Sequence, residues 1–338
     1  MAPTKPVADL VFDQDAGHPG RLVGWMFPGQ GSQRPGMAAG LDACGDLFAA
    51  AKELLEADLA RLCTAVPNPG WPGDLLQPAL YSTAVGALRA LSSRGACPDA
   101  VVGHSLGEYA ALTAAGALSF EDGLALVFLR GKGMLSAAQI NPGGMAAVIG
   151  LDGAAIEALC AGIDGVWVAN RNSPGQTVIS GLDAPLAQAA EACREAGARR
   201  VVRLDVPIAG HCPLMASAAA ELEEALATVE LHEPVCPFYS GVDARPHTDP
   251  AEIKALLVQA MTSPVRFSET LRAMQDAGIG ALVEVGPARV LCGLAKQSVP
   301  QMSTTSVGSD ADAESYVAST GDPVTAGNEP GERVTVDD

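Results

Sequence analysis

Basic residues are scarce in this sequence, and they do not gather into a dense run. The chain has 21 Lys and Arg against 39 Asp and Glu, which gives a formal net charge of −18 over 338 residues. Contact with nucleic acid or with an anionic membrane depends on local cationic charge. The composition therefore argues against both kinds of partner.

Signals of a membrane, secreted or metal-binding protein are missing as well. No apolar stretch approaches the ~18 residues that a membrane span needs, and residues 1–20 hold three Asp and no apolar signal-peptide segment. The eight cysteines are scattered without a Cys-x-x-Cys pair, which favours reduced thiols and no metal site. We expect a flexible leader over 1–20 and a cytoplasmic protein.

Leu, Ile, Phe and Trp are absent from residues 301–338. This segment holds eight acids and one base, a charge of −7, so the other 300 residues carry −11. A segment of this composition buries too little apolar surface to offset the conformational entropy lost on ordering. The sequence therefore predicts a disordered acidic tail over 301–338, which we expect to be dispensable for activity.

The rest of the chain alternates short apolar strands with helical patterns. Apolar residues make up 48 % of the sequence, which is enough for a sizeable core. The main strands are expected at 23–27, 100–102, 235–240 and 281–285, and the helices at 43–63, 75–94, 106–117, 120–139, 213–228, 250–260, 268–277 and 289–298. This alternation predicts an α/β domain, with a mostly parallel sheet covered on both faces.

The order of expected strands and helices changes between residues 143 and 207. There the order of expected elements is β-α-β-β-α-β, which is that of a ferredoxin-like unit. Since α/β elements resume after it, we interpret 143–207 as a small domain inserted into a large domain made of 21–142 and 208–300.

Ser105 is the first candidate for catalysis, because GHSLG at 103–107 fits G-x-S-x-G between an expected strand and an expected helix. That context is typical of a nucleophile elbow, although a plain packed turn is the alternative. The amide of Leu106, at the helix start, could donate to a developing oxyanion. The glycine-rich loop FPGQGSQ at 27–33 lacks the lysine of a P-loop and does not fit G-x-G-x-x-G. It is either a second oxyanion donor or a simple tight loop.

A serine nucleophile needs a base, and five histidines are available. His211 follows the small domain's last strand, on the seam between domains where active sites often form. His104 is expected to be structural, while His18 lies in the leader and His232 and His247 are expected in exposed loops. The residues alone leave open whether His211 meets Ser105.

Arg130 lies in the apolar helical stretch LVFLRG at 126–131. Two interpretations are open for it. It either extends along the surface to solvent, or it holds a carboxylate in a bidentate pair.

Seven motifs, taken in order, resemble the malonyl-CoA:acyl carrier protein transacylases, which include the discrete acyltransferases that serve polyketide synthases in trans. They are FPGQGSQ at 27–33, GHSLGEYAAL at 103–112, LRGKGM at 129–134, AN-x-NSPGQ-x-VISG at 169–181, GHCPLM at 210–215, SPVRF at 263–267 and EVGP-x-x-VL at 284–291. The resemblance covers about 20–300 and implies an α/β-hydrolase-like large domain with a ferredoxin-like insert.

The resemblance also implies the roles of the site residues. Ser105 would be the nucleophile, His211 its base and Arg130 the ligand of the substrate carboxylate. The amides of Gln30 and Leu106 would form the oxyanion hole, and a backbone carbonyl around Arg266 would orient the histidine.

The activity implied is ping-pong transfer of a carboxyacyl group from CoA to the phosphopantetheine thiol of an acyl carrier protein, which can be a carrier domain of a polyketide synthase. The CoA thioester is the substrate and no cofactor is expected. A thioester hydrolase and a non-catalytic carrier-binding subunit are the alternatives. The carrier protein, the choice between fatty-acid and polyketide pathways and the oligomeric state stay open.

The run Ile208-Ala-Gly-His211 departs from the malonyl-selective pattern, in which a bulky Phe often precedes the histidine. Together with Leu106, Ile208 and Gly210 are expected to surround the C2 substituent of the substrate. The Ala-Gly-His ending, with Gly210, resembles that of relatives that load ethylmalonyl or larger units. Leu106 instead favours malonyl, since relatives that select branched units usually carry Gln after the nucleophile. Both a 2-alkylmalonyl group and malonyl alone therefore remain candidates.

Overall fold

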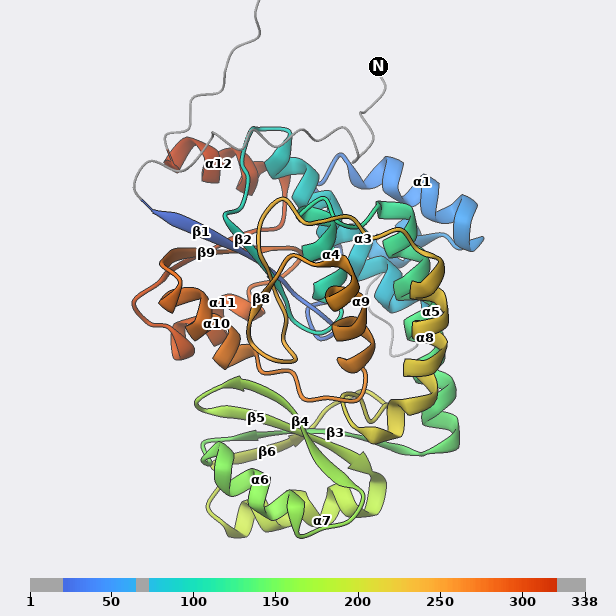
Figure 1. Ribbon diagram of the computed structural model, residues 1–338, viewed down its shortest axis with the longest axis vertical. Coiled ribbons are helices and arrows are strands. Elements are labelled where there is room, and N and C mark those ends of the chain that lie inside the picture. Colours follow the sequence, from blue (N-terminus) through green and yellow to red (C-terminus); the bar gives the residue numbers. More distant parts are fainter. Residues whose placement is uncertain (1–20, 65–72, 321–338) are drawn as a thin grey trace, which may run out of the picture.

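A six-stranded sheet forms the centre of the large domain (Figure 1). The computed structural model describes residues 21–64 and 73–320. The sheet has the order β10-β9-β1-β2-β7-β8, and every pairing is parallel except that of β7 with β8. Its strands are β1 (Leu22–Phe27), β2 (Ala100–Gly103), β7 (Phe238–Tyr239), β8 (Pro246–His247), β9 (Ile279–Val285) and β10 (Ser303–Val307).

The central strand β1 shows why both faces of this sheet are covered. Successive side chains of a strand point to opposite faces, and Trp25, Met26 and Phe27 are all fully buried. Trp25 and Phe27 belong to the core cluster under one layer of helices, while Met26 belongs to a second cluster with Phe267 and Met274 on the other face. A strand buried on both faces reads as a continuous apolar run, as this one does.

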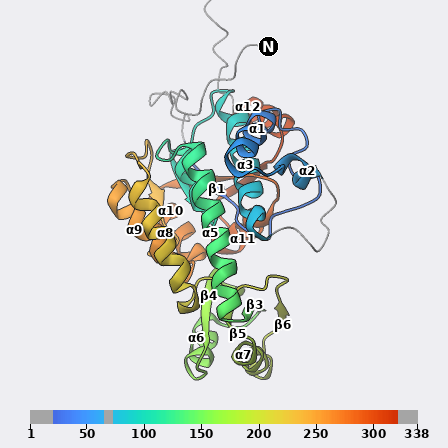
Figure 2. The same cartoon turned by 90° about the vertical axis from the view of Figure 1, so that its right-hand side faces the viewer.

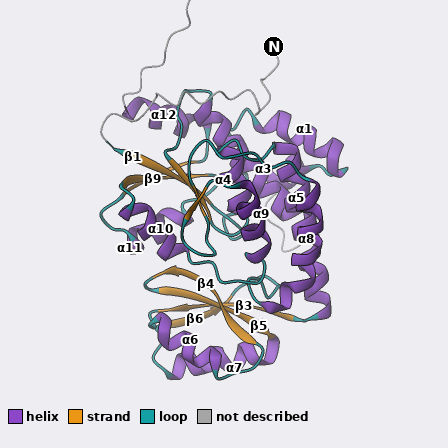
Figure 3. Cartoon of the chain, in the orientation of Figure 1, coloured by secondary structure: helices purple, strands orange, loops and turns teal. Residues whose placement is uncertain are grey.

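Helices form the two covering layers, as Figure 3 shows. The expected helix at 43–63 is split, because Glu56 adopts a left-handed conformation with φ of 53° and ends α1. The helices of the large domain are α1 (Cys44–Leu55), α2 (Leu59–Thr64), α3 (Gly73–Ser92), α4 (Gly107–Ala114), α5 (Phe120–Ile140), the 3₁₀ turn η2 (Pro213–Met215), α8 (Ala216–Thr228), α9 (Pro250–Gln259), α10 (Phe267–Asp276), α11 (Val290–Ser298) and α12 (Asp310–Thr320).

The small domain follows α5, which extends toward it in Figure 2. Its four strands pair antiparallel in the order β4-β5-β3-β6, which is the ferredoxin-like arrangement that the sequence predicts. Both of its helices lie on the face away from the large domain (Figure 1). The elements are β3 (Gly143–Ile149), α6 (Gly153–Ala161), β4 (Val166–Ser173), β5 (Gln176–Leu182), α7 (Asp183–Glu195) and β6 (Arg200–Arg203).

The two domains are joined by backbone hydrogen bonds at the edge of the small sheet. Val265 forms a parallel bridge with Asn170 of β4. Its N–H donates to the carbonyl of Ala169 and its carbonyl accepts from the N–H of Arg171, both over 2.8 Å. The segment before α10 therefore fixes where the small domain sits relative to the large one.

The prediction of a disordered tail over 301–338 is wrong for its first part. β10 pairs in parallel with β9 along five residues, and α12 packs beside it. Val307, Ala313, Tyr316 and Val317 are buried, so one aromatic side chain, together with small and β-branched ones, supplies the apolar contact that the composition seemed to lack. Residues 321–338 and the predicted leader, 1–20, lie outside the described residues.

No helix in the described part of the chain is both long and apolar enough to cross a membrane.

Candidate active site

Ser105 stands on a sharp turn between β2 and α4. Its φ is 55°, in the left-handed region, which holds the side chain clear of both elements at a cost of about 1–3 kcal/mol. The turn requires the two glycines of the motif. A Cβ on Gly103 would overlap the backbone of Glu108, and a Cβ on Gly107 would overlap the carbonyl of Phe27. This is the geometry of a nucleophile elbow.

His211 is the residue that meets this serine. Its Nε2 lies 2.7 Å from the Oγ of Ser105, and its Nδ1 lies 2.8 Å from the carbonyl oxygen of Ala260. Since Nδ1–H donates to that carbonyl, the lone pair of Nε2 faces the hydroxyl and can accept its proton. The sequence left this meeting open, and the structure brings the two side chains together.

The predicted orienting carbonyl is not that of Arg266, although the SPVRF segment in which it was expected does contribute, since the backbone of Ser263 also hydrogen-bonds His211. The Arg266 carbonyl accepts from the N–H and from the hydroxyl of Thr270, both over 2.9 Å, because it begins α10. Ala260 instead ends α9, where the last carbonyls of a helix have no partner within it. The end of α9 therefore supplies the acceptor for His211, six residues earlier than expected.

Burial keeps His211 neutral. Only 5 % of the residue is exposed, and burial, followed by the positive charge of Arg130, lowers its pKa to about 3, although the carbonyl of Ala260 opposes the shift. The imidazole is therefore unprotonated throughout the neutral range and available as a base.

Arg130 lies in the interior rather than at the surface. It comes from the middle of α5, which begins where the Ser119 hydroxyl accepts from the N–H of Asp122 over 3.0 Å. Its Nη2 donates to the Oγ of Ser105 over 3.0 Å and its Nη1 to the Oε1 of Gln77 over 2.8 Å. Within the described ranges it forms no ion pair, so a buried guanidinium lies beside the Ser105 hydroxyl without a contacting carboxylate.

Gln77 is a site residue that the sequence reasoning missed. It is 1 % exposed in α3, and besides receiving a hydrogen bond from Arg130 it donates through Nε2 to the Oε1 of Gln30 over 3.2 Å. The same Nε2 lies 3.5 Å from the sulfur of Met134. A signal was present, since Gln77 is the one polar side chain in the run LLQPAL at 75–80.

The loop after β1 packs directly on the elbow. The N–H of His104 donates to the carbonyl of Phe27 over 2.9 Å, and a Cβ on Gly29 would overlap the carbonyl of His104 and lie 3.5 Å from the amide of Leu106. Among the described residues, neither the Gln30 nor the Leu106 amide donates to another backbone group. Both amides are therefore available to donate to a bound group.

Gly210 leaves space beside Ser105 and His211. A Cβ at this position would lie 3.5 Å from the Cε of Met134 and 3.7 Å from the sulfur of Met145, both ordinary contacts. Ile208 lines a cavity of about 930 Å³ together with residues of both domains, among them Gln30 and Arg203. Leu106 is 2 % exposed. The site therefore has flexible thioether side chains where the sequence places the C2 substituent.

The remaining histidines differ in their surroundings. The Nε2 of His104 lies 2.8 Å from the Oδ1 of Asn172, and its ring packs edge-on against Phe267, which fits the expected structural role. His232 is exposed, as expected. His247 is not exposed as expected, since only 13 % of its side chain is accessible and its Nε2 hydrogen-bonds the carboxylate of Asp243. His18 lies outside the described residues.

Comparison with known proteins identifies the family. Residues 24–316 match the acyl transferase domain family. The chain belongs to it. This acyltransferase is 40 % identical over 295 residues to the malonyl CoA-acyl carrier protein transacylase of Haemophilus influenzae, a match that covers 83 % of this chain and 94 % of that protein. It is also 39 % identical over 307 residues to the polyketide biosynthesis protein ThaF of Burkholderia thailandensis, covering 89 % of this chain and 25 % of that longer protein.

Solved structures of malonyl transacylases have the same fold as this acyltransferase. The malonyl CoA-acyl carrier protein transacylase of Coxiella burnetii superposes with a TM-score of 0.85 at 34 % identity, covering 88 % of this chain and 97 % of that one. A malonyl-transacylase solved with its type II polyketide acyl carrier protein also has a TM-score of 0.85, at 36 % identity over 88 % of this chain and 99 % of the other. The resemblance seen in the sequence, and the two-domain fold it implied, are confirmed.

Proposed function

We propose that this acyltransferase moves a malonyl-type group from CoA to the phosphopantetheine thiol of an acyl carrier protein, through an ester on Ser105. One observation carries the proposal. A buried guanidinium, that of Arg130, lies within hydrogen-bonding distance of the nucleophile and has no contacting carboxylate in the described part of the chain. An acyl group that ends in a carboxylate would provide the missing partner.

The first half-reaction follows from the geometry. The Oγ of Ser105 attacks the thioester carbon as its proton passes to the Nε2 of His211, 2.7 Å away. The amides of Gln30 and Leu106 donate to the oxyanion, which collapses, breaks the C–S bond and releases CoA with the proton from His211. General-base assistance contributes ~10²–10⁴ in rate, and losing one oxyanion donor reduces kcat by ~10²–10³.

The second half-reaction runs the same steps with a different thiol. His211 takes the proton of the phosphopantetheine thiol, the sulfur attacks the acyl-serine ester, and Ser105 leaves with the proton. The reaction therefore needs no cofactor beyond the thioester itself. We place it in the cytoplasm, where the eight cysteines, none of them in a disulfide, stay reduced.

Two other functions fit the site less well. A thioester hydrolase needs no buried cation beside the nucleophile, so Arg130 argues against it. A non-catalytic carrier-binding subunit would not need a serine and histidine held 2.7 Å apart. The three functions differ in the acyl group expected on Ser105. A transferase keeps it until a carrier protein arrives, a hydrolase releases it rapidly as free acid, and a binding subunit never forms it.

A 2-alkylmalonyl substrate is a second candidate, supported by the space at Gly210. Its missing side chain faces Met134 and Met145, whose unbranched thioethers adapt to irregular shapes. An ethyl group on C2 could displace them, whereas a Phe at this position would fill the same space. Gly210→Ala, whose Cβ fits without overlap, is the matched control for Gly210→Phe.

Intact-mass measurement after incubation with malonyl-CoA, ethylmalonyl-CoA and acetyl-CoA tests these proposals together. We expect a carboxyacyl adduct that persists for minutes without carrier protein and is absent from Ser105→Ala. Rapid release of free acid would favour the hydrolase, and no adduct would favour the binding subunit. If Gly210→Phe left the ethylmalonyl-to-malonyl ratio of kcat/KM unchanged, the alkyl pocket would be wrong.

A further inference from the structure

A chain of side-chain hydrogen bonds runs from the nucleophile to the loop after β1. Arg130 donates to the Oγ of Ser105 over 3.0 Å and to the Oε1 of Gln77 over 2.8 Å. Gln77 in turn donates through its Nε2 to the Oε1 of Gln30 over 3.2 Å. A guanidinium only donates, so the oxygen of Gln77 must face Arg130 and its nitrogen is left for Gln30. One buried amide therefore contacts both the cation and the loop.

The side chain of Gln77 is held between α3 and α5. It is 1 % exposed, and a Cβ on Gly131, the residue after Arg130, would lie 3.5 Å from the Cδ of Gln77. The amide group therefore packs against the backbone of α5 next to the cation. This packing fixes the amide in place, so its two hydrogen bonds have a rigid origin.

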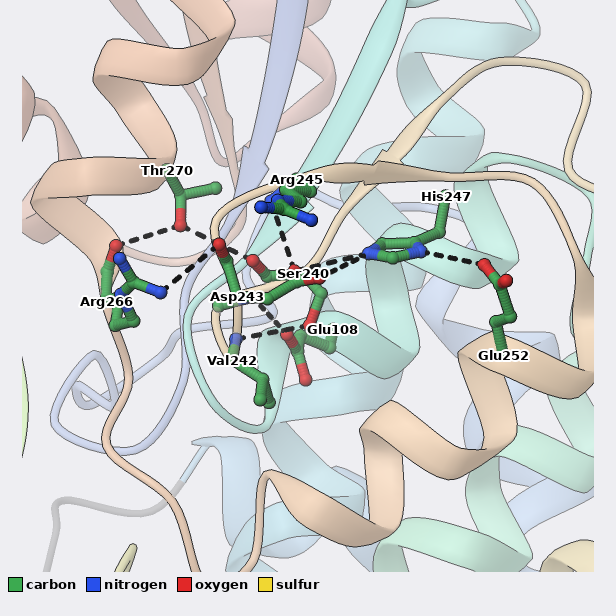
Figure 4. A network of polar contacts seen from close by, with 10 residues as sticks. Glu108, Ser240, Val242, Asp243, Arg245, His247, Glu252, Arg266 and Thr270 are labelled. Atoms are coloured by element: carbon green, nitrogen blue, oxygen red, sulfur yellow. Dashed lines mark hydrogen bonds and ion pairs between the residues drawn. The ribbon is translucent and has the colours of Figure 1, made fainter.

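The partner of the guanidinium is a neutral dipole and not a charge. The buried carboxylate of α4, that of Glu108, accepts from the N–H of Gly241 over 2.9 Å and lies beside the loop that joins β7 to β8 (Figure 4). An amide oxygen orients a guanidinium through a hydrogen bond and leaves its positive charge without a counter-ion. Gln77 therefore fixes the direction of Arg130 while the charge stays available to a substrate carboxylate.

Gln30 belongs to a tight turn that Gln77 joins to α3. The N–H and the hydroxyl of Ser32 donate to the carbonyl of Gly29 over 3.3 and 2.7 Å. Gly31 has a φ of 99°, the positive value that the third residue of a type II turn requires. Among the described residues, the side chain of Gln30 forms no hydrogen bond besides the one with Gln77. The position of the Gln30 amide, a proposed oxyanion donor, thus depends on α3.

We propose that Gln77 is a positioning residue that sets the distance between the carboxylate site and the oxyanion hole. Its oxygen fixes the cation, and its nitrogen fixes the turn that carries the Gln30 amide. The inference rests on the proposed function, since it requires Arg130 to hold the substrate carboxylate. A malonyl group joins its carboxylate to its thioester carbonyl through one carbon, so its reaction depends on this distance. An acetyl group depends on the oxyanion end alone.

Single-turnover acylation of the full chain by malonyl-CoA and by acetyl-CoA tests the proposal. Gln30→Met removes the acceptor of Gln77 and keeps the backbone N–H. It should slow both thioesters by the same factor, about twofold to tenfold, because one neutral hydrogen bond is lost. Gln77→Met should slow acetyl by that factor and malonyl by more. The double variant should acylate with acetyl no more slowly than Gln77→Met, since both changes break one bond.

Gln77→Glu separates the two roles of the amide. The new carboxylate would pair with Arg130 inside the protein, and the amide of Gln30 can turn its Nε2 toward it, so the turn stays anchored. Malonyl acylation should fall by about thirtyfold or more, because the cation is no longer available to the substrate. Acetyl acylation should stay within about threefold of its original rate, since a neutral hydrogen bond to the turn remains. Gln77→Met, of similar length and without either polar atom, is the matched control.

Two outcomes would overturn the proposal. A malonyl-to-acetyl ratio that Gln77→Glu leaves unchanged would show that Gln77 does not orient the cation that the substrate uses. Acetyl losses that add in the double variant would show that Gln30 and Gln77 act separately, through packing. Single-turnover rate constants do not depend on the folded fraction, so a partly unfolded variant leaves the test intact. Failure of the proposed function looks different: Arg130→Met would then leave the malonyl-to-acetyl ratio unchanged.

Discussion

The guanidinium of Arg130 donates a hydrogen bond to the Oγ of Ser105 over 3.0 Å, on the same oxygen that lies 2.7 Å from the Nε2 of His211. This hydrogen bond from the cation stabilises a lone pair of the serine oxygen, and the charge of Arg130, after burial, also lowers the pKa of His211. A substrate carboxylate on Arg130 would relieve both effects. The site is thus expected to become more nucleophilic and its base stronger when a carboxyacyl group is bound.

Arg130→Met is expected to abolish the preference for carboxyacyl groups. Acetyl leaves the buried cation without a partner at a penalty of ~2–5 kcal/mol, so the wild-type malonyl-to-acetyl ratio should exceed about thirtyfold. The variant lacks the cation and should acylate at similar rates with both thioesters. Rapid-quench measurement of acyl-enzyme formation gives the two rates. A ratio unaffected by the substitution would show that Arg130 does not hold the carboxylate.

The acid side of the pH profile should lack the usual histidine inflection. Because the pKa of His211 is lowered to about 3 in the free enzyme, the base stays unprotonated from pH 8 down to pH 5. kcat/KM for acylation by malonyl-CoA, which reports the free enzyme, should show no fall near pH 6.5. kcat should fall at a higher pH than kcat/KM, since the bound carboxylate offsets the charge of Arg130. A fall in kcat/KM with a midpoint near 6.5 would contradict the buried, neutral base.

Gln77→Leu should slow acylation by malonyl-CoA, because the guanidinium of Arg130 loses the hydrogen bond that it donates to the Oε1 of Gln77. A hydrogen bond to a charged group contributes ~1.5–3 kcal/mol, so kcat/KM should fall by about tenfold to a hundredfold. Ser82→Ala is the matched control, because Ser82 is fully buried on the same helix and its hydroxyl has no partner among the described residues. Acylation by malonyl-CoA should therefore be slower in Gln77→Leu than in Ser82→Ala. If both lost activity equally, Gln77 would act only through the packing of α3.

Arg199 and Arg200 are expected to receive the carrier protein. Carrier proteins are usually acidic, and both arginines are exposed at the edge of the small sheet, where neither forms an ion pair within the described ranges. Arg203, the last residue of the same strand, is instead paired with Asp183. Arg200→Glu should raise KM for the carrier while leaving the acylation rate with malonyl-CoA unchanged. Arg194→Glu, on the outer helix α7, controls for net charge, and an equal rise in KM for both variants would mean that no specific patch exists.

Sequence patterns predicted the elements that periodicity and glycine define. Apolar runs marked β1 and β2, and the spacing of Gly103, Ser105 and Gly107 marked the elbow, because close packing there excludes any side chain. Gln77 was not predicted, because a lone polar residue in an apolar helical run indicates a buried polar group but not which residue that group contacts. Ala260 was missed for another reason: the acceptor for His211 is a carbonyl, so its position depends on where α9 ends and not on residue type.

The C-terminal segment shows how small residues can complete a fold, and its two parts should differ in their importance. β10 adds a parallel edge strand to β9, and α12 buries Tyr316 and Val317. Asp310 of this segment also bonds the N–H of Asp42 over 2.8 Å and pairs with Arg94 over 3.2 Å.

Deletion of 303–338 should therefore expose one face of the large domain and destabilise it by several kcal/mol, since burying one large apolar side chain contributes about 1.5–3 kcal/mol. Deletion of 321–338 alone should leave acyl transfer intact. Urea denaturation and carrier acylation of the two truncated chains separate these effects. Equal stability of both would mean that β10 and α12 contribute little, whereas loss of transfer in the shorter deletion would assign a role to the last eighteen residues.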